Sequence, residues 1–421
     1  MELEIANVKV SDLLKRYPTP LYVYNQEVIE ENLQVFRENF QSEKFATKIL
    51  YASKAFQAVA LLNLIADAGL GLDVVSQGEL YAASKSRMPL ENIYFHGNNK
   101  SPEELLFAIL NVKISHIVVD NKMELEVVSE LASLVKRPLQ ILLRLNVGIE
   151  AHTHQYVITS HVDSKFGMGI ESQELKDCLK MIETHPFLVL EGLHSHIGSQ
   201  IFELTAWFAA IEKLTDFLHD LSEQSEQDEP LALNIGGGFG VRYTQEDKPL
   251  PIDQVLRQLI HHVEKCMAEK NVRLKALMIE PGRSLVAEAG LTLYKIGYQK
   301  VTPNKNYLFV DGGMGDNIRP SLYQAKYDCD LALRLGERKT ERFSIAGKYC
   351  ESADILIENA ELPKPERGDI LVVYGTGAYG YSMASNYNRN VIPGVVFLKD
   401  GKITEVVKRQ TLEQLLENEV Y

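Results

Sequence analysis

Lys54 is a residue whose type and position could support covalent chemistry. It stands in Tyr-Ala-Ser-Lys-Ala, directly after an apolar run typical of a buried strand. Flanking alanines could leave its ammonium partly desolvated, and desolvation makes an amine a better nucleophile toward an aldehyde because it lowers the amine's pKa. The alternative is an ordinary solvated surface lysine, and Lys54 alone does not separate the two interpretations.

A glycine-rich run follows a later strand pattern and includes Gly236, Gly237, Gly238 and Gly240. Because glycine has no Cβ, the backbone N–H groups of such a turn can approach a phosphate closely. The spacing matches neither a P-loop, since no Gly-Lys-Ser/Thr follows, nor a clean GxGxxG fingerprint. By itself the run fits a phosphate site and a plain turn equally well.

Glu280 and Arg283 lie three residues apart beyond another strand pattern. A carboxylate can hold a pyridine nitrogen protonated, and a guanidinium can clamp a phosphate or carboxylate through paired hydrogen bonds. A salt bridge between the two residues is the alternative interpretation.

His194 and His196 alternate at strand spacing, so they share one face of a strand. A lone histidine is more often a satisfied core residue, but two on one face favour a functional role. No carboxylates stand at a spacing specific for a metal ion, and we therefore predict no metal site.

The second half of the chain offers scattered polar residues. Cys350 and Glu351 follow a strand pattern, Tyr379 sits in a Gly-Ala-Tyr-Gly turn, and Arg319 and Tyr323 lie four residues apart. A free cysteine is usually a small buried residue, such turns are often only structural, and an arginine–tyrosine pair can simply lie on the surface. Taken singly, these residues do not define a function.

Eight apolar segments are predicted to be strands, and amphipathic helical stretches fill the gaps between them. Most are rich in Ile, Leu and Val, as in strands buried on both faces of a parallel sheet. They are 48–53, 70–75, 93–96, 116–120, 139–147, 188–196, 231–235 and 274–280. Eight strands with helices between them match a TIM barrel, in which residues at the C-terminal strand ends face one mouth. An open doubly wound sheet has the same local pattern.

Beyond Arg283 the pattern changes to strands separated by turns, with a helical stretch only at LEQLLENE near the end. Residues 19–25 are strand-like, and we predict that they pair with this C-terminal region. The expected fold is α/β: a TIM barrel over residues 26–285, followed by a mainly antiparallel β domain formed by residues 1–25 and 286–421. The polar run 222–230 is predicted to be a barrel loop.

Composition and charge limit the possible classes of protein. The chain has 421 residues, with 45% hydrophobic and 24% charged side chains, which suits two globular domains. A net charge of −13 argues against nucleic acid as a partner. The four cysteines form no CxxC pair or disulfide framework. We see no signal peptide and no membrane-length apolar run, and we expect a cytoplasmic protein without a membrane partner.

Taken together, the motifs resemble those of the diaminopimelate decarboxylases, a branch of the decarboxylases that use pyridoxal phosphate (PLP). YASKA, HGNNKS, HSHIGSQ, NIGGGFG, EPGRSLVAEAG, RPSLYQAKY, CESADIL and GAYGYSMASNYN are similar to that family's pattern in order and spacing, from about residue 19 to 390. HSHIGSQ and EPGR are shared more widely among barrel-type PLP decarboxylases, whereas RPSLY, CES and GAY narrow the resemblance to this branch. The segment 152–161 is less diagnostic.

The resemblance implies a role for each matched residue. Lys54 would carry PLP covalently, Glu280 would pair with its pyridine nitrogen, and His196 would stack on its ring. The implied cofactor-binding residues are Lys54, His196, Ser199, Gly237, Gly238, Gly240, Glu280, Gly282, Arg283 and Tyr379. The implied substrate-binding residues are Arg283, Arg319, Tyr323, Glu351 and Tyr379. Cys350 would donate a proton to the carbanion that remains after CO₂ departs.

The resemblance also implies the reaction and the assembly. The family decarboxylates meso-2,6-diaminopimelate at its D-configured centre, which yields L-lysine and CO₂ in the last step of lysine biosynthesis. In the family, the CES segment comes from the partner subunit, so an obligate homodimer with shared active sites is implied.

Two alternatives remain open. A relative that acts on ornithine, arginine or carboxynorspermidine should lose the basic partner assigned to Arg319, because diamino-monoacid substrates lack a distal carboxylate. A non-catalytic PLP carrier should lack the β region and the CES segment, and a regulatory homologue should have lost Lys54 or Cys350. The presence of all these features favours diaminopimelate as the substrate.

Overall fold

The computed structural model describes residues 1–149, 151, 164–224 and 229–420. The chain divides into two compact units. We call residues 33–240 and 249–282 the barrel unit, and residues 1–32, 241–248 and 283–421 the β unit. Within the described ranges, no helix has the length and apolar character needed to cross a membrane.

The barrel unit contains eight parallel strands that close on themselves. They are β4 (Ala46–Ala52), β5 (Gly71–Val74), β6 (Ile93–Phe95), β7 (His116–Val119), β8 (Leu139–Asn146), β10 (Leu188–His194), β11 (Leu231–Asn234) and β12 (Leu274–Ile279). Each strand pairs in parallel with the next in this order, and β12 pairs with β4 to complete the ring. The short strand β9 (Met168–Gly169) lies beside the end of β8. The predicted TIM barrel is therefore confirmed, and the open doubly wound sheet is excluded.

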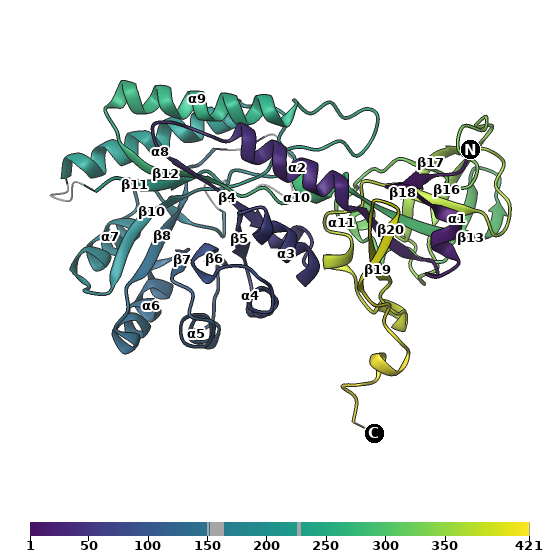
Figure 1. Cartoon of the computed structure of the whole chain (residues 1–421), viewed down its shortest axis with the longest axis horizontal. Coiled ribbons are helices and arrows are strands. Elements are labelled where there is room, and N and C mark those ends of the chain that lie inside the picture. The colour runs from purple at the N-terminus through teal and green to yellow at the C-terminus, as the bar shows by residue number, and fades with distance from the viewer. Residues whose placement is uncertain (150, 152–163, 225–228, 421) are drawn as a thin grey trace. The chain divides into compact units, whose positions relative to one another are not determined.

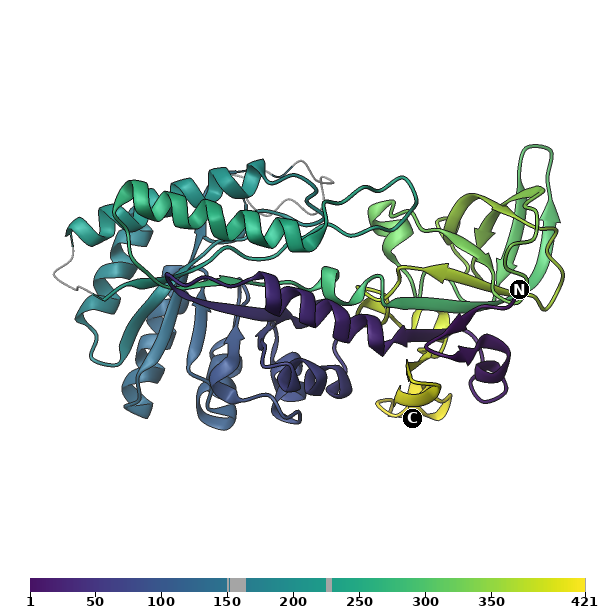
Figure 2. The ribbon, with the colours of Figure 1, turned by 45° about the horizontal axis from the view of Figure 1, so that its top comes forward.

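Helices surround this ring of strands (Figure 1). They are α3 (Val59–Asp67), α4 (Gln77–Ser84), α5 (Pro102–Leu106), α6 (Lys122–Val135), α7 (Gln173–Thr184), α8 (Thr205–Gln224) and α9 (Ile252–Lys270), with shorter turns η1 (Ser53–Ala55) and η2 (Leu90–Asn92) and the π-helix η3 (Phe107–Val112). Helix α2 (Gln26–Asn39) precedes β4. Helices α8 and α9 lie side by side (Figures 1 and 2), joined by an ion pair between Asp216 and Lys270 at 2.6 Å.

Apolar side chains fill the middle of the barrel. Leu50, Val118, Leu142 and Met278 belong to one buried cluster contributed by four different strands. Because side chains alternate along a strand, the inward-facing positions nearest the C-terminal ends carry a second layer above this cluster. That layer is polar: its members include Asp73, His96, Asp120, His194, Asn234 and Glu280, all of them buried.

The β unit is built on a second sheet. The strands that lie on its main path are β17 (Ile355–Leu362), β16 (Glu341–Ala346), β14 (Asn306–Val310), β13 (Gly290–Val301), β3 (Leu21–Asn25), β19 (Gly394–Lys399) and β20 (Lys402–Val407), in that spatial order. Strand β18 (Ile370–Tyr374) pairs with β13 and with β15 (Cys329–Leu331). Most pairs are antiparallel, and a separate hairpin joins β1 (Glu4–Ile5) to β2 (Val8–Lys9).

The β unit also contains short helices. They are α1 (Val10–Leu14), α10 (Arg283–Val286), α11 (Arg319–Tyr323) and the single turns η4 (Tyr381–Met383), η5 (Tyr387–Arg389) and η6 (Glu413–Leu415). The helical stretch predicted near the C-terminus is reduced to η6. Strand β3 pairs with β13 and β19, which confirms that the N-terminal strand joins the C-terminal region.

Other sequence predictions meet the structure only in part. The predicted loop 222–230 begins inside helix α8, which includes residues 222–224, and residues 225–228 lie outside the described part of the chain. The segment 152–161 also lies outside the described residues. The predicted domain boundaries, 26–285 for the barrel with 1–25 and 286–421 for the β domain, remain a prediction. The compact units place 26–32, 241–248 and 283–285 with the β unit.

Candidate active site

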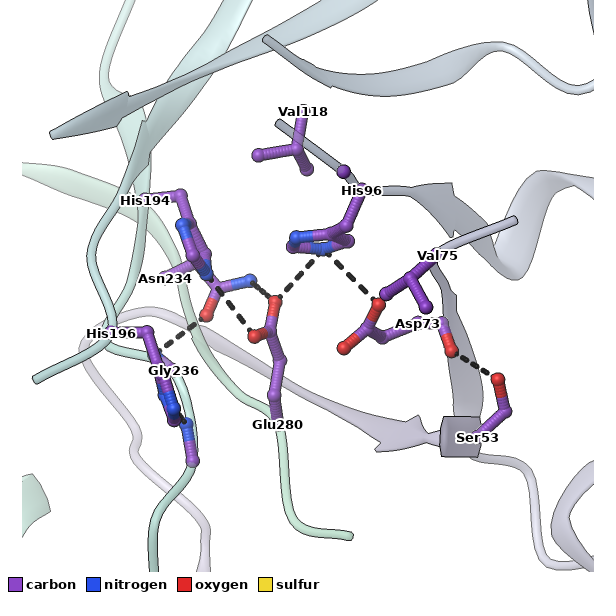
Figure 3. Close-up of polar contacts among 12 residues, drawn as sticks. Ser53, Asp73, Val75, His96, Val118, His194, His196, Asn234, Gly236 and Glu280 are labelled. Atoms are coloured by element: carbon purple, nitrogen blue, oxygen red, sulfur yellow. Dashed lines mark hydrogen bonds and ion pairs between the residues drawn. The ribbon is translucent and has the colours of Figure 1, made fainter. Parts of the chain in front are cut away.

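A buried carboxylate, Glu280, is the centre of a polar network at the C-terminal end of the barrel strands (Figure 3). It stands one residue beyond β12. Its Oε2 lies 3.1 Å from His194 Nε2, and its Oε1 lies 3.1 Å from His96 Nε2. Asn234 Nδ2 donates a hydrogen bond to Oε1 at 2.7 Å. Residues from three other strand ends therefore hold both oxygens of one carboxylate.

This network controls the protonation state of its members. Burial disfavours the charged form of Glu280, but His96 and His194 together outweigh burial and hold the pKa of Glu280 well below its usual range. Burial lowers the pKa of His194 to about 4, so this imidazole is neutral near pH 7. Burial and the charge of Lys54 also lower the pKa of His196 well below its usual value. The site thus presents an ionised carboxylate together with the uncharged imidazoles of His194 and His196.

Lys54 lies in the turn η1 directly after β4, where its side chain is exposed. Burial raises the pKa of Asp73 and of Glu79, and the charge of Lys54 opposes the rise in both. The neighbouring Ser53 Oγ donates to Asp73 O at 2.7 Å and to the Glu79 carboxylate at 3.1 Å. The turn that carries Lys54 is thereby tied to β5 and α4, within the electrostatic reach of two carboxyl groups.

The glycine-rich turn packs against the backbone of its neighbours. A Cβ at Gly237 would lie 2.0 Å from Glu280 O, and a Cβ at Gly238 would lie 2.3 Å from Gly198 O. Gly237 N donates to His196 Nδ1 at 3.1 Å, which fixes this imidazole nitrogen as an acceptor. Only glycine allows the turn to pass this close to the strand ends.

The same turn connects the remaining predicted cofactor residues of the barrel unit. Ile201 N donates to Gly238 O at 2.9 Å, and Gly240 N donates to Ile201 O at 3.1 Å, so the loop carrying Ser199 runs beside the turn. On the other side, a Cβ at Gly282 would lie 3.0 Å from the Cβ of Ala52, close to the turn that carries Lys54.

In the β unit, two arginines and three tyrosines form a separate cluster. Arg283 donates to Tyr243 Oη, and its guanidinium lies 4.8 Å from the ring centroid of Tyr379. Arg319 donates to Tyr327 Oη and lies 4.7 Å from the ring centroid of Tyr243. Three predicted residues, Arg283, Arg319 and Tyr379, are therefore brought together, and Tyr323 stands at the end of the same short helix as Arg319.

The Cys350 segment lies on the surface of the β unit. Cys350, Glu351, Ser352 and Ala353 are all exposed. Tyr387 donates to the Glu351 carboxylate, and Cys350 N donates to Asn388 Oδ1 at 2.9 Å. Ser321 Oγ donates to Ala353 O at 2.7 Å, which links this segment to the helix of Arg319.

Several residues of these clusters escaped prediction from the sequence. Asn234 contacts Glu280 and could have been found, since it too stands at a C-terminal strand end. His96, which also contacts Glu280, ends the predicted strand 93–96 and was expected at the same mouth of the barrel. Tyr243 and Tyr327 carried no comparable signal, because a tyrosine in a loop region has no pattern that separates it from a surface residue.

His96, His194 and Glu280 also satisfy the geometry of a possible metal site, with one ligand atom from each within 4.8 Å of the others. Both oxygens of Glu280 already take part in the contacts with His194, Asn234 and His96, which an ion would have to displace. Glu280 suits another purpose better, because an ionised buried carboxylate can keep a ring nitrogen protonated. The absence of a metal site stays a prediction.

The groups of the barrel unit fit PLP. They comprise an accessible lysine amine, an ionised buried carboxylate, a neutral imidazole and a turn of glycines whose backbone has no Cβ to block close approach. These groups on a TIM barrel define the class of pyridoxal-dependent decarboxylases. The family model described as "Pyridoxal-dependent decarboxylase, pyridoxal binding domain" matches residues 26–287.

Similar proteins narrow this class. The chain is 46% identical to the diaminopimelate decarboxylase of Bacillus methanolicus, over 97% of this chain and 94% of that protein. It is 45% identical to the enzyme of Bacillus subtilis strain 168, over 98% and 94% of the two chains. The crystal structure of diaminopimelate decarboxylase from Helicobacter pylori complexed with L-lysine has a TM-score of 0.88 and 31% identity, over 97% of this chain and 98% of that one. The chain belongs to the diaminopimelate decarboxylase family, and its cofactor is PLP.

Proposed function

We propose that this chain catalyses the PLP-dependent decarboxylation of meso-2,6-diaminopimelate to L-lysine and CO₂. The relatives that it matches along nearly its whole length carry the name of this activity. The observation that carries the choice of substrate is Arg319, which is only 7% exposed and pairs with no carboxylate in the described part of the chain. A buried cation without an acid partner suits a substrate that brings its own second carboxylate.

In this proposal, Lys54 holds the cofactor covalently, Glu280 binds its pyridine nitrogen and His196 covers its ring. Ser199, Gly237, Gly238, Gly240, Gly282, Arg283 and Tyr379 complete the cofactor site. Bound PLP supplies an electron sink for the pair of electrons that is released when the carboxylate leaves as CO₂. The ionised state of Glu280 supports its role, since only a carboxylate can stabilise a proton on the ring nitrogen.

The proposed substrate contacts come from the β unit. Arg319 and Tyr323 take the distal carboxylate and Glu351 takes the distal ammonium, so each group meets a partner of opposite charge or a hydrogen-bond donor. Arg283 and Tyr379 are the other proposed substrate contacts. Cys350 Sγ donates the proton that replaces CO₂ on the reacting carbon.

We further propose a homodimer in which Cys350 and Glu351 complete the active site of the partner subunit. The exposure of both residues in the single chain supports this arrangement. Subunits with Lys54→Ala and subunits with Cys350→Ala, each inactive alone, should regain activity when mixed, because one site of each hybrid dimer holds both intact residues. Absence of complementation would contradict shared sites.

The experiment that tests the reaction measures CO₂ release from meso-diaminopimelate, ornithine, arginine and lysine. We expect release only from meso-diaminopimelate, with L-lysine formed in equal amount. Preference for ornithine or arginine would overturn the proposed substrate, and no release from any of them would support a non-catalytic role. The cytoplasmic location and the absence of nucleic-acid and membrane partners remain predictions from the sequence.

A further inference from the structure

Arg319 has an unusual environment for a buried cation. Its guanidinium lies over the ring faces of Tyr243 and Tyr327, 4.7 and 5.6 Å from their centroids, and it donates to the hydroxyl of Tyr327. Cation–π contacts and a neutral acceptor compensate only part of the cost of burying a charge. In the described ranges, no carboxylate supplies the rest. Arg319 therefore retains a strong attraction for an anion.

Tyr243 contacts both arginines of this cluster. Its hydroxyl accepts a hydrogen bond from Arg283, while its ring face takes Arg319. The ring also meets that of Tyr327 edge to face, at 5.4 Å between centroids. Tyr243 is 8% exposed and Tyr327 is 4% exposed, so water is largely excluded from these contacts. One side chain thus holds two like charges near each other in a poorly hydrated region.

The backbone around Tyr243 is tied down. Asp247 Oδ2 accepts hydrogen bonds from Tyr243 N at 3.0 Å and from Thr244 N at 2.8 Å. Gly375, at a φ of +72°, lies beside the ring, since a Cβ there would be in ordinary van der Waals contact with Tyr243 Cδ1 at 3.4 Å. A ring that is fixed in this way can orient its neighbours.

We propose that Tyr243 determines substrate specificity by positioning Arg283 and Arg319 as one receptor for the distal carboxylate of the substrate, with Tyr327 as its support. This inference rests on the proposed function. A carboxylate that enters the cluster compensates the buried charge of Arg319, whereas a substrate without that carboxylate leaves this charge uncompensated. Tyr243 acts through the arginines and is therefore a positioning residue.

The test compares two competitive inhibitors of diaminopimelate decarboxylation. L-Lysine retains the distal carboxylate of the substrate, and cadaverine is the same molecule without that carboxylate. We expect Tyr243→Phe to raise the inhibition constant of L-lysine about tenfold, because the variant loses one hydrogen bond to a charged donor. The inhibition constant of cadaverine should change by less than about twofold. Tyr243→Leu removes the ring face as well and should have a larger effect. Tyr327→Phe should resemble Tyr243→Phe.

A matched control is available at the surface of the same unit. Tyr298 is 66% exposed and has Arg367 4.8 Å from its ring centroid, so Tyr298→Phe changes an arginine–tyrosine pair away from the cluster. It should alter neither inhibition constant. Calorimetric binding of L-lysine and the melting temperature of each variant separate lost affinity from lost folding.

The outcomes distinguish this inference from the proposed function. If the wild-type enzyme releases no CO₂ from meso-diaminopimelate, both are overturned. A second outcome is that the wild-type enzyme releases CO₂ while Tyr243→Phe and Tyr327→Phe raise the inhibition constants of L-lysine and cadaverine equally, or raise neither. In that case only the positioning role of Tyr243 is overturned.

Discussion

His194 Nε2 lies 3.1 Å from Glu280 Oε2 inside the barrel unit, and both side chains are buried. The two residues are 86 positions apart in the chain. The imidazole is neutral and the carboxylate ionised, which follows from the burial of the first and the hydrogen-bonded surroundings of the second. This pairing is the basis of two predictions.

The first prediction concerns the charge of Glu280. Glu280→Gln keeps the size of the side chain but removes its negative charge. It also replaces one of the two accepting oxygens by an NH₂ group, which cannot accept the hydrogen bonds that the neighbouring side chains donate. We expect decarboxylation to fall by about a hundredfold and retention of PLP on dialysis to weaken, because the ring nitrogen loses its counter-charge. Steady-state rates and cofactor content would be measured together. Wild-type turnover in this variant would exclude Glu280 from the cofactor site.

The second prediction concerns pH. Since the pKa of His194 is lowered to about 4 in the folded chain, the unfolded chain binds more protons between that value and the ordinary pKa of histidine, about 6.5. Stability should therefore decrease as pH falls from about 6.5 to about 4.

His194→Gln tests this dependence, because glutamine keeps an N–H donor for Glu280 but does not titrate. Denaturant unfolding at a series of pH values should show a shallower loss of stability in the variant. Some loss will remain, because burial also lowers the pKa of His196. Identical pH profiles for variant and wild type would contradict the assignment of a buried neutral His194.

A third prediction comes from Asp316 in the β unit, where burial raises the carboxyl pKa to about 7. Tyr294 Oη donates to its Oδ2 at 2.5 Å, and Gly313 N donates to its Oδ1 at 3.0 Å. The folded state then holds a proton that the unfolded state releases above its ordinary pKa, near 4. Stability from this group should be lost as pH rises from about 4 through about 7.

Asp316→Asn should remove this loss, since the amide does not ionise. The free energies of unfolding of variant and wild type would be compared at pH 5 and pH 8. We expect the stability of the variant relative to the wild type to be greater at pH 8 than at pH 5. A wild-type stability that changes in parallel with the variant across this range would rule out the raised pKa.

The fourth prediction concerns a polar cluster at the N-terminal end of the barrel strands. Tyr94 Oη donates to Glu191 Oε1 at 3.0 Å, and His116 Nδ1 lies 2.6 Å from Glu191 Oε2. Lys48 Nζ donates to the same tyrosine hydroxyl at 2.9 Å. Glu191→Ala should cost about 3 kcal/mol of unfolding free energy, because it leaves buried partners without their acceptor.

The rate per folded enzyme should stay unchanged in Glu191→Ala, since catalytic groups lie at the opposite strand ends. Glu191→Gln keeps one accepting oxygen and should therefore lower the free energy of unfolding by less than Glu191→Ala does. Glu361→Gln breaks the exposed pair with Arg342 and should change stability by no more than about 0.5 kcal/mol. A Glu191→Ala variant as stable as this control would show that the cluster contributes nothing.

The sequence alone determined the alternation of strands and helices, the separate β region and the motifs that carry Lys54, Glu280, Arg319 and Cys350, whereas the closure of the strands into a barrel was settled by the structure. These features are local: each depends on the periodicity or order of residues close together in the chain. The pairing of β3 with the C-terminal sheet was also predictable, because its strand pattern had no place in the barrel repeat.

Only the tertiary structure decided which atoms meet. Asn234 reaches Glu280 from another strand because the barrel closes, and Tyr243 lies between Arg283 and Arg319 because three separate segments of chain meet within the β unit. Burial, which sets the pKa of His194 and of Asp316, likewise depends on packing between residues that are distant in sequence. Such contacts leave no periodic pattern in the chain, so the charge state of the site follows from the fold and not from any one motif.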